Sequence, residues 1–202
     1  MRKTLLLIIG ILLSINLSAQ TAEEFFNNVI EKTKSYNDIS IVFNYKIINK
    51  EAGIYETMSG YASMKGSSYK LNVDGQEMIS DGKVLWTHLI DDEEVMISEV
   101  TDDNNSPLAI IESFSNNVTV SFLENNAETK AIEIKENDGE SFEKIILTTD
   151  KDLKIKKIHA YLSDGNEFVY EITEFTTNQN LPDSMFTFDE SLYPNVEVID
   201  MR

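Results

Sequence analysis

Short segments of alternating apolar and polar residues constrain this chain more than any other feature. In "SYKLNVD" (68–74), Tyr69, Leu71 and Val73 alternate with polar side chains, the pattern of a strand with one buried face. Turn residues such as Asp81-Gly82 separate the segments. The predicted strands are 39–47, 55–65, 68–74, 77–80, 83–89, 95–98, 118–123, 130–136, 142–148, 155–162 and 167–176. We therefore expect a mainly β fold, a meander of about eleven antiparallel strands.

Two helices are expected beside these strands. Thr21 and Glu24 have the spacing of a capping box, and apolar residues recur at helical spacing after them, so residues 21–34 should form a helix. Ser106 and Pro107 favour a helix start, and "PLAIIESF" predicts a short second helix. A sheet this wide should curl because strands twist, with the helices in its concave apolar interior. The pattern leaves open whether that interior is filled or holds a cavity.

The first 19 residues have the features of a signal peptide. Arg2 and Lys3 precede a compact apolar run that ends in small residues, so cleavage is expected after Ala19. A retained membrane anchor is the alternative, but the run is shorter than the roughly 20 residues that span a bilayer. We expect residues 20–202 to form a single exported, soluble domain that resides in the periplasm.

Composition excludes several classes of function. The formal charge is −18. Removal of the leader, which contains two basic residues, makes the charge more negative still. Binding to nucleic acid or to an anionic membrane needs clustered Lys and Arg, so neither is expected. The chain has no cysteine, which excludes disulfides and thiolate chemistry.

Residues that could carry out catalysis are scarce. His88 and His159 are isolated on predicted strands, and no serine lies in a nucleophile elbow. The acidic clusters 91–94 and 102–103 lie in predicted loops and lack the alternate-residue spacing of a calcium loop, so solvated turns explain them better than a weak calcium site. We expect no catalytic residues, no metal and no cofactor, and therefore no enzyme.

The segment "MISDGKVLWTHLIDDEEVMI" (78–97) resembles one that recurs in the periplasmic outer-membrane lipoprotein carrier family, LolA. In both, a Ser-Asp-Gly-Lys turn leads into a Leu-Trp strand and then an acidic turn. Other landmarks also occur in the family's order. They are "YNDISIVFNYKI" and "GYASMKGSSYKL" before this segment, and the Ser-Pro helix and "FTFDESLYPNVEVIDMR" after it. The resemblance implies an unclosed, strongly curved antiparallel β-barrel of about eleven strands with a helical lid over an apolar cavity, as the twist of a wide sheet also suggests. The pattern does not decide whether Trp86 faces this cavity.

The resemblance also implies a function. The chain would bind the acyl chains of lipoproteins and carry them from an inner-membrane ABC-type release complex to the outer membrane or a receptor there, acting as a monomer. A sensor or regulatory module on the same scaffold, or a carrier of another exported lipid or glycolipid, are the alternatives.

Candidate lipid-binding residues follow from this assignment. They are the apolar face of three predicted strands and the apolar sides of the two helices: Ile41, Phe43, Tyr45, Tyr69, Leu71 and Val73, with Phe26, Val29, Leu108 and Ile111. Four methionines, at positions 58, 64, 78 and 96, would suit an adaptable surface, although ordinary core filling explains them too. Lys65-Gly66 stands where other members of the family carry Arg-Pro, an Arg associated with holding the lid closed. Lys65 can donate a single hydrogen bond there but cannot form a guanidinium fork, so its control of the lid is expected to be weaker.

Overall fold

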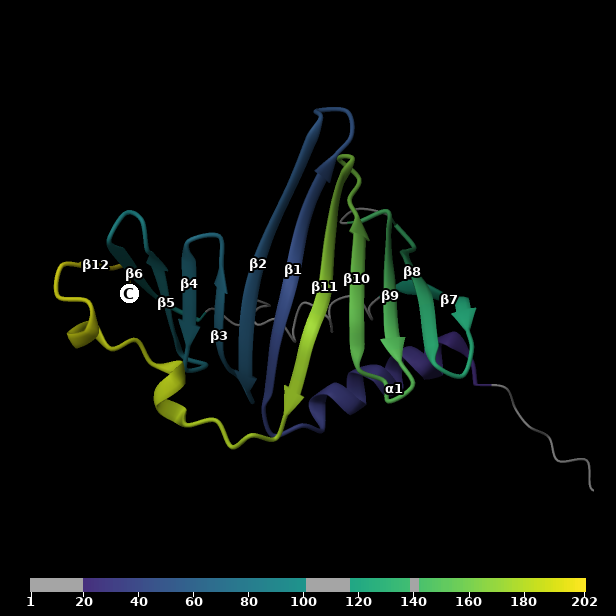
Figure 1. Cartoon of the computed structure of the whole chain (residues 1–202), viewed down its shortest axis with the longest axis horizontal. Coiled ribbons are helices and arrows are strands. Elements are labelled where there is room, and N and C mark those ends of the chain that lie inside the picture. The colour runs from purple at the N-terminus through teal and green to yellow at the C-terminus, as the bar shows by residue number, and fades with distance from the viewer. Residues whose placement is uncertain (1–19, 101–116, 139–141) are drawn as a thin grey trace, which may run out of the picture.

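The computed structural model describes residues 20–100, 117–138 and 142–202 (Figure 1). Its strands are β1 Ile39–Asn49, β2 Ile54–Lys65, β3 Ser68–Val73, β4 Gln76–Ser80, β5 Val84–Leu89, β6 Glu94–Glu99, β7 Val118–Asn125, β8 Thr129–Glu136, β9 Lys144–Asp150, β10 Ile155–Tyr161, β11 Asn166–Thr177 and β12 Glu197–Asp200. They form one 12-stranded sheet in the order β12-β6-β5-β4-β3-β2-β1-β11-β10-β9-β8-β7. Because β12 and β7 lie at opposite ends, the sheet is not closed. The predicted mainly β, unclosed barrel is confirmed.

Each of the eleven predicted segments overlaps one strand, because turn chemistry determines where the chain reverses. Asp81 accepts hydrogen bonds from the amides of Lys83 and Val84 at 2.8 Å each, and Gly82 supplies a positive φ of 88°. Asp74 and Gly75, at φ 53° and 73°, make a turn with the right-handed twist that adjacent strands need. These local signals can be read from the sequence.

The helix α1, Ala22–Lys34, has the predicted capping box: Thr21 Oγ1 accepts from the Glu24 amide and Glu24 Oε2 accepts from the Thr21 amide, both at 3.1 Å. It runs across β7 to β10 (Figure 1) and buries its apolar side on them. Among the described helices none is long and apolar enough to cross a membrane. The face of the sheet that α1 covers is called the inner face below.

Strand register assigns every side chain to a face, since directly opposed residues point the same way. Ile41 lies opposite Ala62, which lies opposite Leu71, and this row continues to the inner face of β4. Trp86 lies opposite Ile79 and Ile97, one position out of phase with that row. Trp86 therefore lies on the outer face.

The C-terminal segment differs from the prediction. Two 3-10 helices, Asp183–Phe186 and Glu190–Leu192, follow β11, and β12 then pairs with β6 in parallel. This twelfth strand adds one parallel pair to a sheet whose other pairs are antiparallel. A four-residue strand beside a proline carries too little pattern to be recognised; its pairing with β6 makes it a strand.

This segment packs on the outer face. Phe186 is 1% exposed, and the His88 ring has the rings of Phe188 and Tyr193 against it, at centroid distances of 5.7 and 4.7 Å. Ile79 and Val95 beneath are buried too. The outer face of β3 to β6 thus has a small core of its own.

A buried carboxylate fixes the start of the C-terminal segment. Asp38, 2% exposed, accepts hydrogen bonds from the backbone amides of Gln179, Asn180 and Leu181 at 2.8, 2.9 and 3.3 Å. Burial raises the pKa of this carboxyl, but the three amides outweigh it, so the net pKa lies below its ordinary value. Asp38 joins the α1–β1 connection to the end of β11.

Candidate functional site

The inner face has two parts that differ in packing. Under α1, Phe25, Ile132 and Ile145 are at most 1% exposed, and this core contains residues of α1 and of β7 to β11. No residue of β1 to β6 belongs to it. There, half-buried apolar side chains line the inner face: Ile41, Tyr45, Met58, Met64, Leu71, Val73 and Met78. We call these seven residues the apolar wall.

Aromatic stacking extends the wall onto β11. The ring of Tyr45 stacks on those of Tyr170 and Phe168, with centroids 4.8 and 5.9 Å apart, and Phe43 lies 6.1 Å from Tyr170. Burial, followed by the neighbouring Tyr170, raises the pKa of the Tyr45 phenol. The phenol is therefore uncharged at neutral pH, and this part of the wall is apolar with two hydroxyls at its rim.

Tyr69 has an unusual hydroxyl. Its side chain shares the inner face with Ile39 and Met64 and is 3% exposed, yet the hydroxyl has no hydrogen-bond partner among the described residues. Burial raises the pKa of this phenol, so it carries its proton. A buried polar group without a partner costs about 1–3 kcal/mol. The structure thus places one unused hydrogen-bond donor beside the apolar wall.

The predicted lipid-binding residues fall into three groups. Ile41, Tyr45, Leu71 and Val73 are half-buried members of the wall, whereas Phe43 and Tyr69 beside them are buried. Phe26 and Val29 are 2% and 0% exposed inside the packed core under α1. The remaining two, Leu108 and Ile111, lie outside the described residues, as does the Ser-Pro helix. The structure brings the strand residues together on one surface and puts the α1 residues beneath a packed layer.

Lys65 contacts the C-terminal segment. Its Nζ donates to the Leu181 carbonyl at 2.7 Å and to Asp183 Oδ1 at 2.6 Å. Met64, its neighbour in β2, belongs to the wall, so Lys65 lies on the outer face. These contacts connect Lys65 to the segment that follows β11, and its control of a lid stays a prediction.

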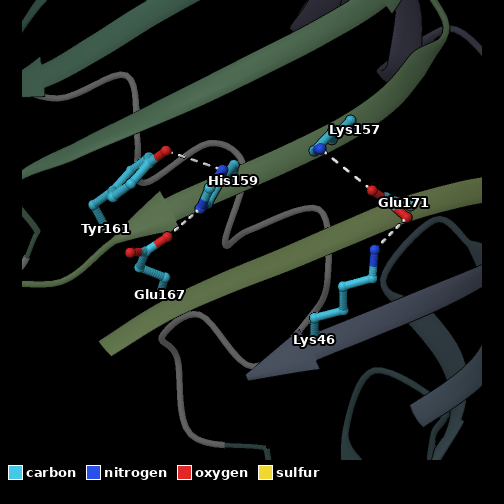
Figure 2. A network of polar contacts seen from close by, with 6 residues as sticks. All are labelled: Lys46, Lys157, His159, Tyr161, Glu167 and Glu171. Carbon is cyan, nitrogen blue, oxygen red and sulfur yellow. Dashed lines mark hydrogen bonds and ion pairs between the residues drawn. The ribbon is translucent and has the colours of Figure 1, made fainter. Parts of the chain in front are cut away.

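The outer face of β1, β10 and β11 carries a charged network that sequence reasoning missed (Figure 2). Glu171 pairs with Lys46 at 2.9 Å and Lys157 at 3.2 Å. Glu167 accepts from His159 Nε2 at 2.9 Å, and the Tyr161 hydroxyl lies 3.1 Å from His159 Nδ1. His159 is therefore not isolated. Its partners are found only once the β10–β11 register is known.

This Tyr-His-Glu arrangement lacks the features of a catalytic group. Burial, followed by the Glu167 charge, raises the pKa of Tyr161, the opposite of what an activated nucleophile needs. The hydrogen bond from Lys50 lowers the pKa of Glu167, so this carboxylate is ionised and paired. No group of three or more metal-ligating side chains occurs among the described residues. The network braces strands.

A second polar cluster lies under the C-terminal segment. Glu77 is 6% exposed; its Oε1 accepts from Lys70 at 2.7 Å and from the Tyr61 hydroxyl at 3.2 Å. His88 lies directly opposite Glu77 and is 4% exposed. Within the described part of the chain, Glu77 Oε2 and His88 Nδ1 have no hydrogen-bond partner. Side chains of the tail cover this cluster, so it faces away from the apolar wall.

The sequence was compared with known families and proteins. The model of the family described as "Outer membrane lipoprotein carrier protein LolA" matches residues 69–189, more than half of the chain. The chain belongs to this family. An outer-membrane lipoprotein carrier protein of Francisella philomiragia is 25% identical over 199 residues, covering 86% of this chain and 96% of that protein.

One solved structure supports the fold of this LolA-family chain. An uncharacterized conserved protein of Thermus thermophilus superposes with a TM-score of 0.58 at 10% identity, over 89% of this chain and 98% of that one. A LolA superfamily protein of Nitrosomonas europaea gives a TM-score of 0.43 at 13% identity, over 84% and 98%. At 10% identity the likeness to the Thermus protein concerns the fold alone. The likeness to the Nitrosomonas protein supports no conclusion about this chain.

Proposed function

We propose that this LolA-family protein is a periplasmic carrier, exported by a cleavable signal peptide. It binds the acyl chains of lipoproteins on the apolar wall and moves them from the inner to the outer membrane. The supporting observation is that β1 to β4 present half-buried aliphatic, aromatic and methionine side chains on the inner face outside the core under α1. Surfaces of this kind outside a packed core mark binding sites for apolar partners.

The wall suits a ligand that must later be released. Each methylene removed from water contributes about 0.8 kcal/mol, so even one acyl chain is held strongly against water. A bilayer offers the same gain, and release requires that the wall bind less well than the membrane. Met58, Met64 and Met78 are unbranched and flexible, so they adapt to a chain without close complementarity.

Tyr69 gives the surface a polar contact. Its unpartnered hydroxyl lies on the inner face beside Leu71 of the wall and can donate to an ester carbonyl of an acylated glycerol group. An ordinary membrane lipid and a lipoprotein anchor both carry such esters, so this contact helps hold the anchor without selecting the protein attached to it.

The proposed partners follow from the route. An ABC-type release complex in the inner membrane supplies the acylated lipoprotein, and the outer membrane or a receptor there accepts it. The protein acts as a monomer without cofactor or catalysis. Native mass spectrometry of material from its own periplasm distinguishes the alternatives: a co-purifying triacylated protein supports this proposal, a free lipid indicates another exported cargo, and an empty protein with a stable protein partner indicates a sensor.

Leu71→Glu tests the wall directly. A carboxylate facing acyl chains loses its hydration, so the affinity for a synthetic triacylated lipopeptide should fall at least about 100-fold, equivalent to about 2.7 kcal/mol. Thr119→Glu is the matched control, since Thr119 is exposed on the outer face opposite Lys135. Isothermal titration calorimetry gives both affinities, and circular dichroism checks folding. Wild-type affinity in folded Leu71→Glu protein would show that the wall is not the lipid site.

A further inference from the structure

The sheet has a step where β2 extends past β3. β2 pairs with β1 along its whole length, from Ile54 opposite Asn49 to Met64 opposite Ile39. β3 reaches only as far as Val73, opposite Gly60. Residues 54–59 of β2 therefore have a strand on one side and none of the described strands on the other, and the β1–β2 hairpin projects beyond β3 and β4 (Figure 1).

The free edge is exposed to solvent. Tyr55 is 67% exposed and Ile54 39%, and of the six residues only Met58 is half-buried. Gly66 (φ 58°) and Ser67 form a two-residue turn, so Lys65 and Ser68 are the hydrogen-bonded pair that closes it. Hydrogen-bonded and non-hydrogen-bonded positions alternate along a strand, and the register of β2 has no shift. The backbone N–H and C=O groups of residues 55, 57 and 59 therefore point away from β1.

The two ends of the sheet are protected against pairing with another chain, whereas residues 54–59 carry a single charged side chain, Glu56. β12 is only four residues long, and the register of β7 shifts between Phe122 and Glu124, where an extra residue disrupts the strand. Short strands and bulges are the usual means of preventing pairing with another chain. Residues 54–59 contain no proline and no lysine and pair with β1 without a bulge. About 20 Å of edge is thus available for a further strand of six residues.

The position of this edge identifies the segment that pairs there. Met58, in the middle of the edge, belongs to the apolar wall and lies opposite Tyr45. A strand added beside it lies in line with β3 and directs alternate side chains over the inner face. A polypeptide that carries its acyl chains on a terminal residue can therefore place them on the wall and its backbone on the edge. Pairing through the backbone does not depend on sequence, which suits a carrier of many cargoes.

Resting on the proposed function, we propose that residues 54–59 bind the extended peptide segment next to the acylated residue of the cargo as an additional β-strand. The wall holds the lipid and the edge holds the peptide. Free lipid engages the wall alone, so the edge is what distinguishes an acylated polypeptide from a membrane lipid.

The test uses two synthetic probes with the same triacylated cysteine followed by six residues, one with an ordinary peptide backbone and one N-methylated at alternate residues. The ordinary probe should bind wild-type protein about tenfold more tightly, because up to six backbone hydrogen bonds are partly offset by ordering the peptide. In Thr57→Pro, which removes an outward N–H and blocks strand addition, the ratio of the two affinities should fall to about one.

A second measurement does not depend on any variant. Hydrogen exchange followed by NMR should show the amides of Tyr55, Thr57 and Ser59 slowed at least about tenfold by the ordinary probe, and not by acylated cysteine without a peptide. Equal affinities for the two probes, with unchanged exchange at these amides, would overturn the edge proposal and leave the carrier function intact. Failure of every acylated probe to bind would overturn both. A wild-type dimer that Thr57→Pro dissociates, without any probe dependence, would assign the edge to a second copy of this chain.

Discussion

The unpartnered hydroxyl of Tyr69 leads to a prediction with an unusual sign. Tyr69→Phe keeps the ring and its packing on the inner face and removes only the buried oxygen. Most substitutions of buried residues destabilise a protein. Here the substitution removes a polar group that is desolvated without compensation, a cost of about 1–3 kcal/mol in the free protein. We expect Tyr69→Phe to stabilise the ligand-free protein by about 1 kcal/mol.

Urea unfolding followed by circular dichroism measures this change in free energy, and thermal unfolding should show a rise in Tm of about 2–4 °C for a domain of this size. Tyr45→Phe is the matched control, because the Tyr45 hydroxyl interacts with Tyr170, so its removal should not stabilise the protein. A loss of about 0.5 kcal/mol or more in Tyr69→Phe would mean that this hydroxyl has a partner, and the reasoning would fail.

Ligand binding should change in the opposite direction. If the Tyr69 hydroxyl donates to an ester carbonyl of the bound lipid, Tyr69→Phe loses one hydrogen bond of about 0.5–1.5 kcal/mol and binds an ester lipid about 2- to 10-fold more weakly. Its affinity for the ether analogue, which has no carbonyl, should equal that of the wild type. Equal losses for both lipids would assign the effect to packing.

Three further outcomes follow from polar side-chain contacts. Lys70→Met should lower the free energy of unfolding by about 3 kcal/mol, because it leaves the Glu77 carboxylate buried without its ion-pair partner. The double variant Lys70→Met with Glu77→Met should come within about 1 kcal/mol of wild type. A double-mutant cycle that shows no coupling between the two residues would contradict this. The pKa of Asp38 is lower in the folded protein than its ordinary value of 3.8, so the ionised carboxylate stabilises the fold above that pH. This contribution is lost as the pH falls through the pKa of the folded state, so the difference in Tm between wild type and Asp38→Asn should shrink below about pH 4. A constant difference would show that the carboxylate charge is not involved. Thr21→Ala should lower the free energy of unfolding by about 1 kcal/mol through loss of the capping box, and Thr21→Ser should restore most of it.

The strands were predictable because their signals are local. Alternation in "SYKLNVD" and in 39–47 also gave the faces correctly: Leu71 and Ile41 lie in one row across the sheet through Ala62. Turn residues gave the strand ends to within a few positions. A period of two and a good turn suffice for this much, since neither depends on the rest of the fold.

What the sequence did not supply depends on tertiary arrangement. β12 exists because β6 lies beside it, and the partners of His159 depend on the β10–β11 register. The apolar pattern of α1 shows which side the helix buries but not which strands it covers. Phe26 and Val29, predicted among the lipid-binding residues, pack in the core under α1. Whether an apolar face is packed or open is a property of what lies against it.

The division of the inner face into a core and a wall has a physical consequence for a carrier. A site that fills and empties cannot also supply the stability of the fold, because the protein must remain folded when the lipid leaves. Here the closest packing lies under α1, where Ile132, Ile145 and Phe25 are almost fully buried among protein side chains. The long strands β1 and β11 join that core to the wall, and the ion pairs of Glu171 with Lys46 and Lys157 brace the junction from the outer face. Under the proposed function, loss of the lipid exposes the wall without loosening the core, and the two parts meet the separate requirements of stability and release.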